Sequence, residues 1–385
     1  MKLDRLEAFS SNRFLADYWQ QRPCIISGWL EPGALPLAEL LDLAVSHDLP
    51  TRLVSGHMQQ QAWELVHGPL EVEDLPISAQ YWTVLVQDVD KASTAVAGLL
   101  DQFRFLPDWA IDDIMISDAV DGGSVGPHVD AYDVFLVQAA GQRRWELAMD
   151  FDSEYDQRFE LRLLKSWVPQ LAVTLEPGEA LYLPAGVAHH GVALGPCQTW
   201  SVGLRTPSGP EMLFALAESL ATDETAERRL PVEDIDFRNP SRLTDTQLAA
   251  IRQLLQEALS LDDIKLAEFS GEYLSRWRQW SGDTEPVEPE RVLNCLKQGH
   301  SVPLAASARL ALTDSARGTV LHVNGERVDC PATLALELAA QRKLSSAWVD
   351  YPAAVEQLCE LDAVAAPVRW LETDPANHRR KLSST

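Results

Sequence analysis

Two short segments constrain the fold of this chain more than any other feature of its sequence. The first is Gly-Pro-His-Val-Asp at residues 126–130, and the second runs from Pro177 to His189. His128 and Asp130 are two residues apart, so on a β-strand both side chains leave from the same face. A histidine on another strand would complete a set of two imidazoles and one carboxylate. That set leaves three positions of an octahedron open, which is the arrangement of non-haem Fe(II) oxygenases.

The second segment supplies the missing histidine. It has a proline–glycine turn at 177–178, an apolar strand, a tight turn at 184–186 and then His189, which is the order of the second motif of cupin barrels. His189 and His190 are adjacent, so only one of them can point inward from a strand. The spacing from the tight turn favours His189 as the third ligand, and we expect His190 at the rim of the site.

Short strand signals recur between about residues 24 and 205, and glycine and proline turns separate them. Many short strands with such turns are typical of a sandwich or barrel. We therefore expect a catalytic barrel over residues 1–208. The clearest strands are Cys24–Ile26, Trp82–Val86, Ile114–Ser117, Val134–Val137 and Ala180–Leu183.

The pattern becomes helical after residue 208. A helix is expected over 211–220, and a capping box of Thr244 and Gln247 begins a second one. Leucines and an isoleucine follow at helical spacing, and a third helix is expected near 266–277. Such apolar stripes must pack on the barrel or on a second copy of the chain. We assign residues 209–283 to this helical block.

The last hundred residues form a smaller α+β pattern, which we assign to a domain over 284–385. A polar stretch at 281–286 reads as a linker. Asn324-Gly325 is a strong two-residue hairpin signal. Helices are expected near 289–297, 332–341 and 353–361, and helices with a hairpin at this size indicate a winged-helix unit.

Composition limits the partners and the compartment. The net charge is −25, from 57 acidic and 32 basic residues, so the chain should repel nucleic acid and attract basic proteins. A role of the acidity in solubility alone stays open. No apolar run approaches the roughly 20 residues of a membrane span, and the N-terminus lacks a secretory signal. Five scattered cysteines suit a reducing compartment, so we expect a cytoplasmic protein with no membrane partner.

An arginine next to the metal motif indicates the co-substrate. On a strand, Arg143 shares a face with Trp145 and Leu147, whereas Arg144 points the other way. An inward guanidinium needs an anionic partner. The distal carboxylate of 2-oxoglutarate would suit its two-pronged geometry, and an internal salt bridge is the alternative. Ser117, on the preceding strand, could add a hydroxyl contact.

These residues resemble the JmjC-type cupin oxygenases and, within them, the bacterial ribosomal oxygenases. The resemblance covers the whole chain and is strongest in the first two hundred residues. The matching segments are residues 18–23, 52–55, 106–113, 126–135, 143–145 and 201–205. One departure is His190, where relatives carry an acidic residue.

The resemblance implies a mixed α and β fold. Its parts would be a double-stranded β-helix barrel, a helical dimerisation block and a C-terminal winged-helix domain. It implies a protein hydroxylase that uses Fe(II), 2-oxoglutarate and dioxygen. The expected product is an arginine hydroxylated at its β-carbon in the large-subunit ribosomal protein numbered sixteen. His128, Asp130 and His189 would hold iron, and Arg143 and Ser117 would hold 2-oxoglutarate. Residues 211–280 would form a homodimer.

A substrate guanidinium also needs anionic and aromatic surroundings. Asp118, Tyr132 and Asp133 lie next to the motif strands and are the candidates, although each could be an ordinary surface residue. No catalytic side chain is assigned beyond the metal ligands.

Other functions stay open. A JmjC hydroxylase could act on another residue or protein. A cupin with a different metal would have no need of Arg143. A non-enzymatic winged-helix protein that binds nucleic acid is weakened by the acidic charge, although the basic residues 379–381 would support it.

Overall fold

The computed structural model describes residues 3–58, 62–76, 79–221, 229–236, 238–239, 241–276, 287–315 and 318–365. The chain divides into two compact units, the first ending at Thr206 and the second beginning at Pro207. Each unit is described by itself. No described helix is long and apolar enough to cross a membrane.

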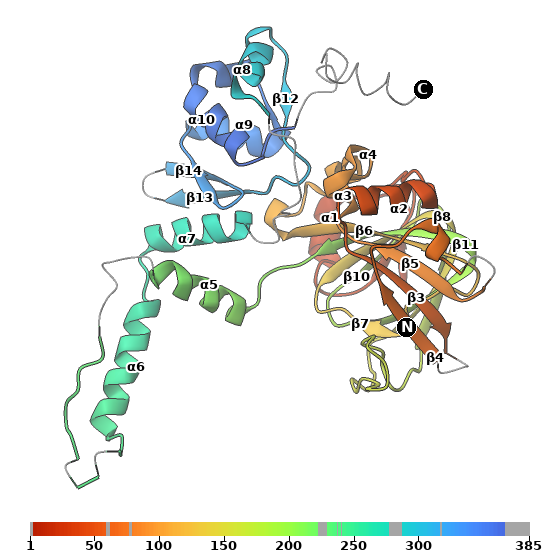
Figure 1. The fold of residues 1–385 in the computed structure, drawn as a ribbon, viewed down its shortest axis with the longest axis horizontal. Helices are drawn as coiled ribbons and strands as arrows, with labels where there is room; N and C mark the ends of the chain where they lie inside the picture. Colours follow the sequence, from red (N-terminus) through yellow and green to blue (C-terminus); the bar gives the residue numbers. More distant parts are fainter. Residues whose placement is uncertain are drawn as a thin grey trace. The chain divides into compact units, whose positions relative to one another are not determined.

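The first unit is built on one eleven-stranded sheet that curves around an interior (Figure 1). Its two longest strands, β8 (Asp133–Ala148) and β11 (Ala188–Leu204), pair antiparallel over nearly their full length. The main path runs β1-β2-β10-β8-β11-β6-β5-β3-β4, with β7 on β11 and β9 on β8. The other strands are β1 (Asp4–Leu6), β2 (Cys24–Ile26), β3 (Thr51–His57), β4 (Ala62–His67), β5 (Trp82–Val86), β6 (Ile111–Ala119), β7 (His128–Val129), β9 (Leu171–Leu175) and β10 (Ala180–Leu183).

Alternating side chains give this sheet two apolar faces. On β8, Phe135 packs with helical residues such as Phe14 and Phe103, and this group is the cluster under the helices. Leu136 instead packs with Trp145, and this group is the inner cluster of the barrel. A sheet that is buried on both faces needs continuous apolar runs, which explains why β8 and β10 show them. The helices of this unit are α1 (Ser11–Asp17), α2 (Leu37–Ser46), α3 (Val89–Ala92), α4 (Thr94–Ala97), η1 (Val72–Asp74), η2 (Gly98–Phe103) and η3 (Asp108–Ala110).

The second unit combines helices with two small antiparallel sheets and has its own core. The helices are α5 (Gly209–Ala221), α6 (Asp245–Leu259), α7 (Asp263–Arg276), α8 (Pro289–Lys297), α9 (Ala332–Gln341), η5 (Ser346–Asp350) and α10 (Pro352–Glu360). The strands are β12 (Val302–Pro303), β13 (Leu310–Ser315), β14 (Gly318–Val323), β15 (Glu326–Val328) and β16 (Lys343–Leu344).

The helical block and the C-terminal part, expected as separate domains, form this one unit. The reason is the packing of α7 on the hairpin β13–β14. Gly271 of α7 lies so close to His322 that a Cβ there would come within 2.2 Å of the imidazole. The Ser275 hydroxyl also accepts a hydrogen bond from the backbone N–H of Gly325 at 3.0 Å. Both contacts join segments about fifty residues apart.

Local signals in this unit are confirmed. Thr244 and Gln247 form the predicted capping box at the start of α6. Asn324 and Gly325 both have positive φ, 50° and 92°, and join β14 to β15 in a tight hairpin. The predicted linker at 281–286 and the basic tail at 377–381 lie outside the described residues.

Candidate metal centre

Three potential metal ligands meet at one end of the barrel. His189, near the start of β11, lies directly opposite His128 of β7 in the strand register. One ligand atom from each of His128, Asp130 and His189 lies within 4.8 Å of the others. The Oδ2 atom of Asp130 is 3.5 Å from His189 Nε2 and 4.0 Å from His128 Nε2. The strand pairing therefore brings together the three residues that the sequence pattern singled out.

Backbone contacts orient both imidazoles in the same way. The Nδ1 atom of His128 is 2.9 Å from the carbonyl oxygen of Gly126, and that of His189 is 3.0 Å from the carbonyl oxygen of Val187. A carbonyl oxygen only accepts, so Nδ1 carries the proton in each ring. The Nε2 lone pairs are then free to bind a cation beside Asp130.

The electrostatics of the site suit a metal ion. Burial, followed by the nearby His128, lowers the pKa of His189 to about 4. The imidazole is thus neutral near pH 7, which is the form that binds metal. Two neutral nitrogens and one carboxylate are the donor set of non-haem Fe(II) centres. The residues present therefore fit Fe(II).

Unpaired donors lie on the inner wall of the barrel. Arg143 is 4% exposed, and its side chain lies 5.8 Å from the ring of Trp145. Nε and Nη2 of Arg143 and Nε1 of Trp145 are buried and have no hydrogen-bond partner among the described residues. Each such donor costs about 1–3 kcal/mol unless a ligand satisfies it. A small dicarboxylate would satisfy them, so the wall fits 2-oxoglutarate.

The orientation predicted for this segment is confirmed. Arg143, Trp145 and Leu147 are buried, whereas Arg144 is exposed and pairs with Glu146 at 3.1 Å. Arg143 makes no direct ion pair with any residue in the described ranges, although its charge acts on the carboxylate of Asp118.

Ser117 belongs to a row of buried polar groups on three neighbouring strands, β6, β11 and β8. Its hydroxyl donates to the carbonyl oxygen of Thr199 at 3.3 Å. The Thr199 hydroxyl donates in turn to Oε1 of Gln138 at 3.0 Å. Gln138 and Thr199 were not found from the sequence, because no motif marks them. Only the register, which places Thr199 opposite both Ser117 and Gln138, brings them together.

A glycine shapes the wall beside the metal ligands. Gly191 lies opposite Trp145 in the register, and a Cβ at this position would be 2.6 Å from the indole ring. The ring can therefore lie across β11, with its centroid 5.9 Å from that of His189. Sequence reasoning did not find this pair, since a glycine in a strand can equally mark a bulge or a bend.

Two of the predicted substrate contacts lie elsewhere. Asp118 follows Ser117 on β6 and so leaves the opposite face, where its carboxylate accepts a hydrogen bond from Gln198 at 3.0 Å. Asp133 accepts a hydrogen bond from the hydroxyl of Tyr182, in the cluster under the helices. Both carboxylates make hydrogen bonds within the barrel wall, and a contact with the substrate stays a prediction for them. Tyr132 instead packs against the inner cluster.

His190 is buried rather than at the rim, which also corrects the sequence prediction. It lies on the outer side of the wall, with Nδ1 3.4 Å from Oε2 of Glu146. The indole of Trp167 donates to the same oxygen at 3.0 Å and meets the His190 ring edge-on. These contacts hold the connection between β8 and β9 against the barrel.

That connection, residues 149–170, also reaches the metal motif. The backbone N–H of Leu164 donates to the carbonyl oxygen of Pro127 at 2.9 Å. Leu163 packs against Gly126, whose φ of +79° favours glycine. The connection therefore stabilises the turn that precedes His128.

Known proteins share both the sequence and the fold. A family model described as a JmjC domain matches residues 98–212. The "Ribosomal protein uL16 3-hydroxylase" of Escherichia coli is 31% identical over 334 residues, which cover 85% of this chain and 87% of that protein. The "Probable ribosomal oxygenase" of Haemophilus influenzae is 30% identical over 333 residues, covering 82% and 81%.

Solved structures agree with these matches. An X-ray structure of E. coli YcfD superposes with a TM-score of 0.77 at 29% identity, covering 92% of this chain and 97% of that one. The complex of the ribosomal oxygenase YcfD with cobalt and 2-oxoglutarate gives 0.75 at 29% identity, with the same coverage. The large sheet and its helices thus have the cupin fold of JmjC proteins.

Proposed function

Because this chain belongs to the ribosomal oxygenase family of JmjC-domain proteins, we propose that it hydroxylates the large-subunit ribosomal protein uL16 on the β-carbon of an arginine. The chain is an Fe(II)- and 2-oxoglutarate-dependent protein hydroxylase. The E. coli relative is a uL16 3-hydroxylase, and carbon 3 of an amino acid is its β-carbon. The observation that carries the proposal is the His-Asp-His cluster beside three unpaired, buried donors.

His128, Asp130 and His189 would hold the iron. When bound, iron and 2-oxoglutarate supply the oxidising chemistry that places one oxygen atom of dioxygen into a C–H bond. The chain itself supplies geometry. Backbone carbonyl groups fix both imidazoles, and the buried wall of Trp145 and Leu147 excludes water. No side chain is needed to move a proton.

Arg143 would bind the distal carboxylate of 2-oxoglutarate through Nε and Nη2, and Ser117 would add a hydroxyl contact. Guanidinium suits this role because two parallel N–H groups match a carboxylate. Trp145 Nε1 is a further donor on the same wall.

Of the three residues predicted to contact the substrate, Tyr132 is the best supported. It is partly buried beside the inner cluster. Burial and then the nearby Asp130 raise its pKa, so the ring stays a neutral phenol. A neutral aromatic ring in acidic surroundings suits a guanidinium group.

The helical block supports a homodimer through residues 211–280. Its described helices expose large apolar side chains, including Phe214 at 68%, Leu255 at 61% and Leu213 at 52%. Large apolar side chains that are exposed in this way are typical of protein contacts. We assign catalysis to residues 1–208 and, within the second compact unit, dimerisation to 209–283 and a winged-helix fold to 284–385.

The partner is a basic protein rather than nucleic acid, in keeping with the net charge of −25. Since ribosomal proteins are made in the cytoplasm, we propose that the enzyme works there.

Mass spectrometry of uL16 tests this function. The purified enzyme is supplied with Fe(II), 2-oxoglutarate, air and uL16, with Asp130→Ala as the inactive control. We expect one added oxygen on a single arginine, absent from the control. Conversion of 2-oxoglutarate to succinate without a change in uL16 would keep the oxygenase and reject this substrate. No product of either kind would reject the function.

A further inference from the structure

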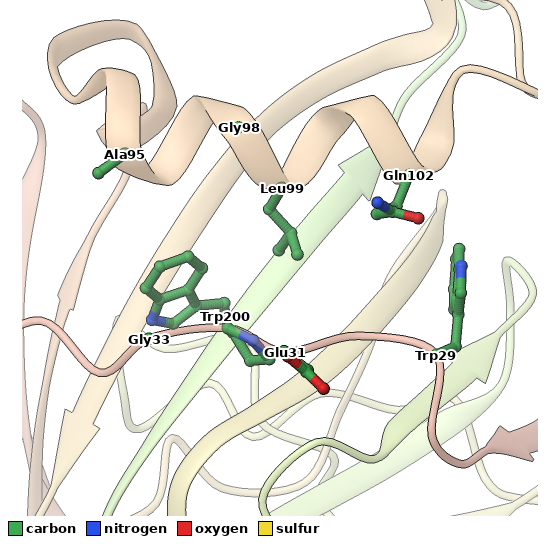
Figure 2. A pocket seen from close by; sticks show the side chains of 9 residues that line it. Trp29, Glu31, Gly33, Ala95, Gly98, Leu99, Gln102 and Trp200 are labelled. Carbon is green, nitrogen blue, oxygen red and sulfur yellow. The ribbon is translucent and has the colours of Figure 1, made fainter.

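A cavity lies on the first unit, between a loop and a helical segment (Figure 2). Its volume is about 350 Å³. Trp29 and Trp200 stand at its two ends, while Leu99 and Gln102 point into it from η2 and Glu31 lies on the loop. We name it the Trp29–Trp200 pocket. Its lining residues are Trp29, Glu31, Pro32, Gly33, Ala95, Gly98, Leu99, Gln102 and Trp200.

This pocket is separate from the metal centre. Trp200 packs in the cluster under the helices, together with Phe135 and Tyr182. The preceding residue, Thr199, leaves the other face of β11, toward the polar row that contains Ser117. The wall of the barrel therefore lies between the pocket and the metal ligands.

One glutamine holds the loop side of the pocket in place. The carboxamide of Gln198 accepts from the backbone N–H of Leu35 at 2.9 Å and donates to the carbonyl oxygen of Leu35 at 2.7 Å. Its Oε1 also accepts the indole N–H of Trp200 at 2.9 Å, and its Nε2 donates to Asp118. The role found for Asp118 is thus to support this glutamine.

The indole at the other end is fixed as well. Trp29 stacks on Phe9 with ring centroids 3.8 Å apart and planes at 16°. It also contacts Phe103, with centroids 5.0 Å apart. A pocket whose aromatic walls are already ordered loses little entropy when a ligand binds.

The lining chemistry favours a cation with an apolar stem. Of the nine lining residues, Glu31 alone is charged. Its carboxylate has no hydrogen bond or ion pair within the part of the chain that is described. Indole rings attract guanidinium and ammonium groups, and a carboxylate adds a charge-assisted hydrogen bond. A metal ion would need several oxygen ligands, which one carboxylate and one carboxamide do not provide.

We propose that the Trp29–Trp200 pocket binds an arginine or lysine side chain of the basic protein substrate, at a position other than the hydroxylated arginine. The identity of the occupant rests on the proposed function. Charge complementarity supports it, because the chain has a net charge of −25 and the ribosomal substrate is basic. The pocket would thus anchor folded uL16 while the reactive arginine occupies the barrel.

Steady-state kinetics with two substrates test the proposal. One is full-length uL16, and the other is a short synthetic peptide around the target arginine. Glu31→Gln removes the charge, and Gln102→Lys adds a repelling one. Glu39→Gln, an exposed acid on α2 outside the pocket, is the matched control. We expect both pocket variants to raise KM for full-length uL16 about three- to tenfold. Values of kcat, KM for 2-oxoglutarate and KM for the peptide should stay unchanged.

Two outcomes would overturn the proposal. In the first, KM for full-length uL16 is unaffected; in the second, it rises equally for the peptide or in Glu39→Gln. Biolayer interferometry with full-length uL16 separates this proposal from the proposed function. Binding that weakens in Glu31→Gln, without hydroxylation by the unsubstituted enzyme, keeps the pocket and rejects the function. If uL16 is hydroxylated but Glu31→Gln binds it as tightly as the unsubstituted enzyme does, the role of the pocket is rejected and the proposed function is kept. If uL16 does not bind at all, the role of the pocket is rejected as well.

Discussion

Leu163 and Gly126 are in such close contact that a Cβ at residue 126 would lie 2.4 Å from Cδ2 of Leu163. Gly126 begins the turn that leads to His128, and its carbonyl oxygen fixes that imidazole. Leu163 belongs to the connection between β8 and β9. A residue far outside the metal motif therefore holds one metal ligand in position.

Shortening the side chain of Leu163 should weaken metal binding. Leu163→Ala is expected to cost about 2–4 kcal/mol of stability, since the side chain is buried. It should also lower the affinity for Co²⁺ about tenfold, because supporting contacts orient metal ligands. Leu70→Ala, a buried leucine in a different cluster, should lose similar stability and keep its affinity. Calorimetric titration would refute the role of Leu163 if both variants bind Co²⁺ alike.

Loss of the carboxylate ligand should abolish turnover. Asp130→Ala is expected to reduce succinate formation more than about a hundredfold, because two histidines alone hold Fe(II) weakly. The melting temperature should change little, since Asp130 is not part of an apolar cluster. Asp42→Ala, an exposed carboxylate on α2, serves as the control. Full activity in Asp130→Ala would rule out the three-residue metal site.

Adjacent arginines offer a matched pair for the 2-oxoglutarate site. Arg143→Gln should raise KM for 2-oxoglutarate about ten- to a hundredfold, because it removes charge-assisted hydrogen bonds. Arg144→Gln, on the exposed side and paired with Glu146, should leave KM unchanged. The measurement is succinate formation against 2-oxoglutarate concentration. An equal change of KM in both variants would show that Arg143 does not bind the carboxylate of 2-oxoglutarate.

A buried carboxyl group should make the first unit less stable at higher pH. Burial, followed by Asp112 and Asp90, raises the pKa of Asp113 to about 7. Between about pH 4 and 7 the folded chain keeps a proton that the unfolded chain releases. The free energy of unfolding should therefore fall as the pH rises through this window. Asp113→Asn should flatten that dependence in thermal melts, and an unchanged slope would contradict the raised pKa.

A buried histidine should have the opposite effect in the second unit. Burial lowers the pKa of His322 to about 4, and the imidazole lies against Gly271 and Thr313. Between about pH 6.5 and 4 the unfolded chain binds a proton that the folded chain does not. Stability should thus fall on acidification, by at most about 3 kcal/mol.

Hydrogen exchange of α7 and β14 amides at pH 4.5 and 7 measures this loss. His322→Gln, which has no titrating ring, should show a smaller difference between the two pH values. An equal difference in both proteins would assign the acid sensitivity to other groups.

The metal ligands could be predicted from the sequence because coordination demands particular residue types at particular spacings. The orientation of Arg143 followed from the alternation of side chains along a strand. The same alternation argues against Asp118, since Ser117 and Asp118 must face opposite sides. Its position next to the motif strands suggested a substrate contact, whereas the structure shows its carboxylate hydrogen-bonded to Gln198.

Other features depend on tertiary contacts that no local pattern contains. The helical block joins the C-terminal part through Gly271 and His322, which are about fifty residues apart. The Trp29–Trp200 pocket takes its lining from three separate segments. Residue type alone does not distinguish Trp29 and Trp200 from core tryptophans, so the pocket had no signal in the sequence.

The pairing of Gly191 with Trp145 has a consequence for how this enzyme could diversify. These two positions share the available space on facing strands, so neither can enlarge unless the other becomes smaller. A lineage that replaced the indole by a smaller side chain could admit a side chain at 191 and reshape the chamber for another keto acid. The metal ligands would be untouched by that exchange. Co-substrate choice in this barrel can therefore evolve by a compensated double replacement, independently of the capacity to hold iron.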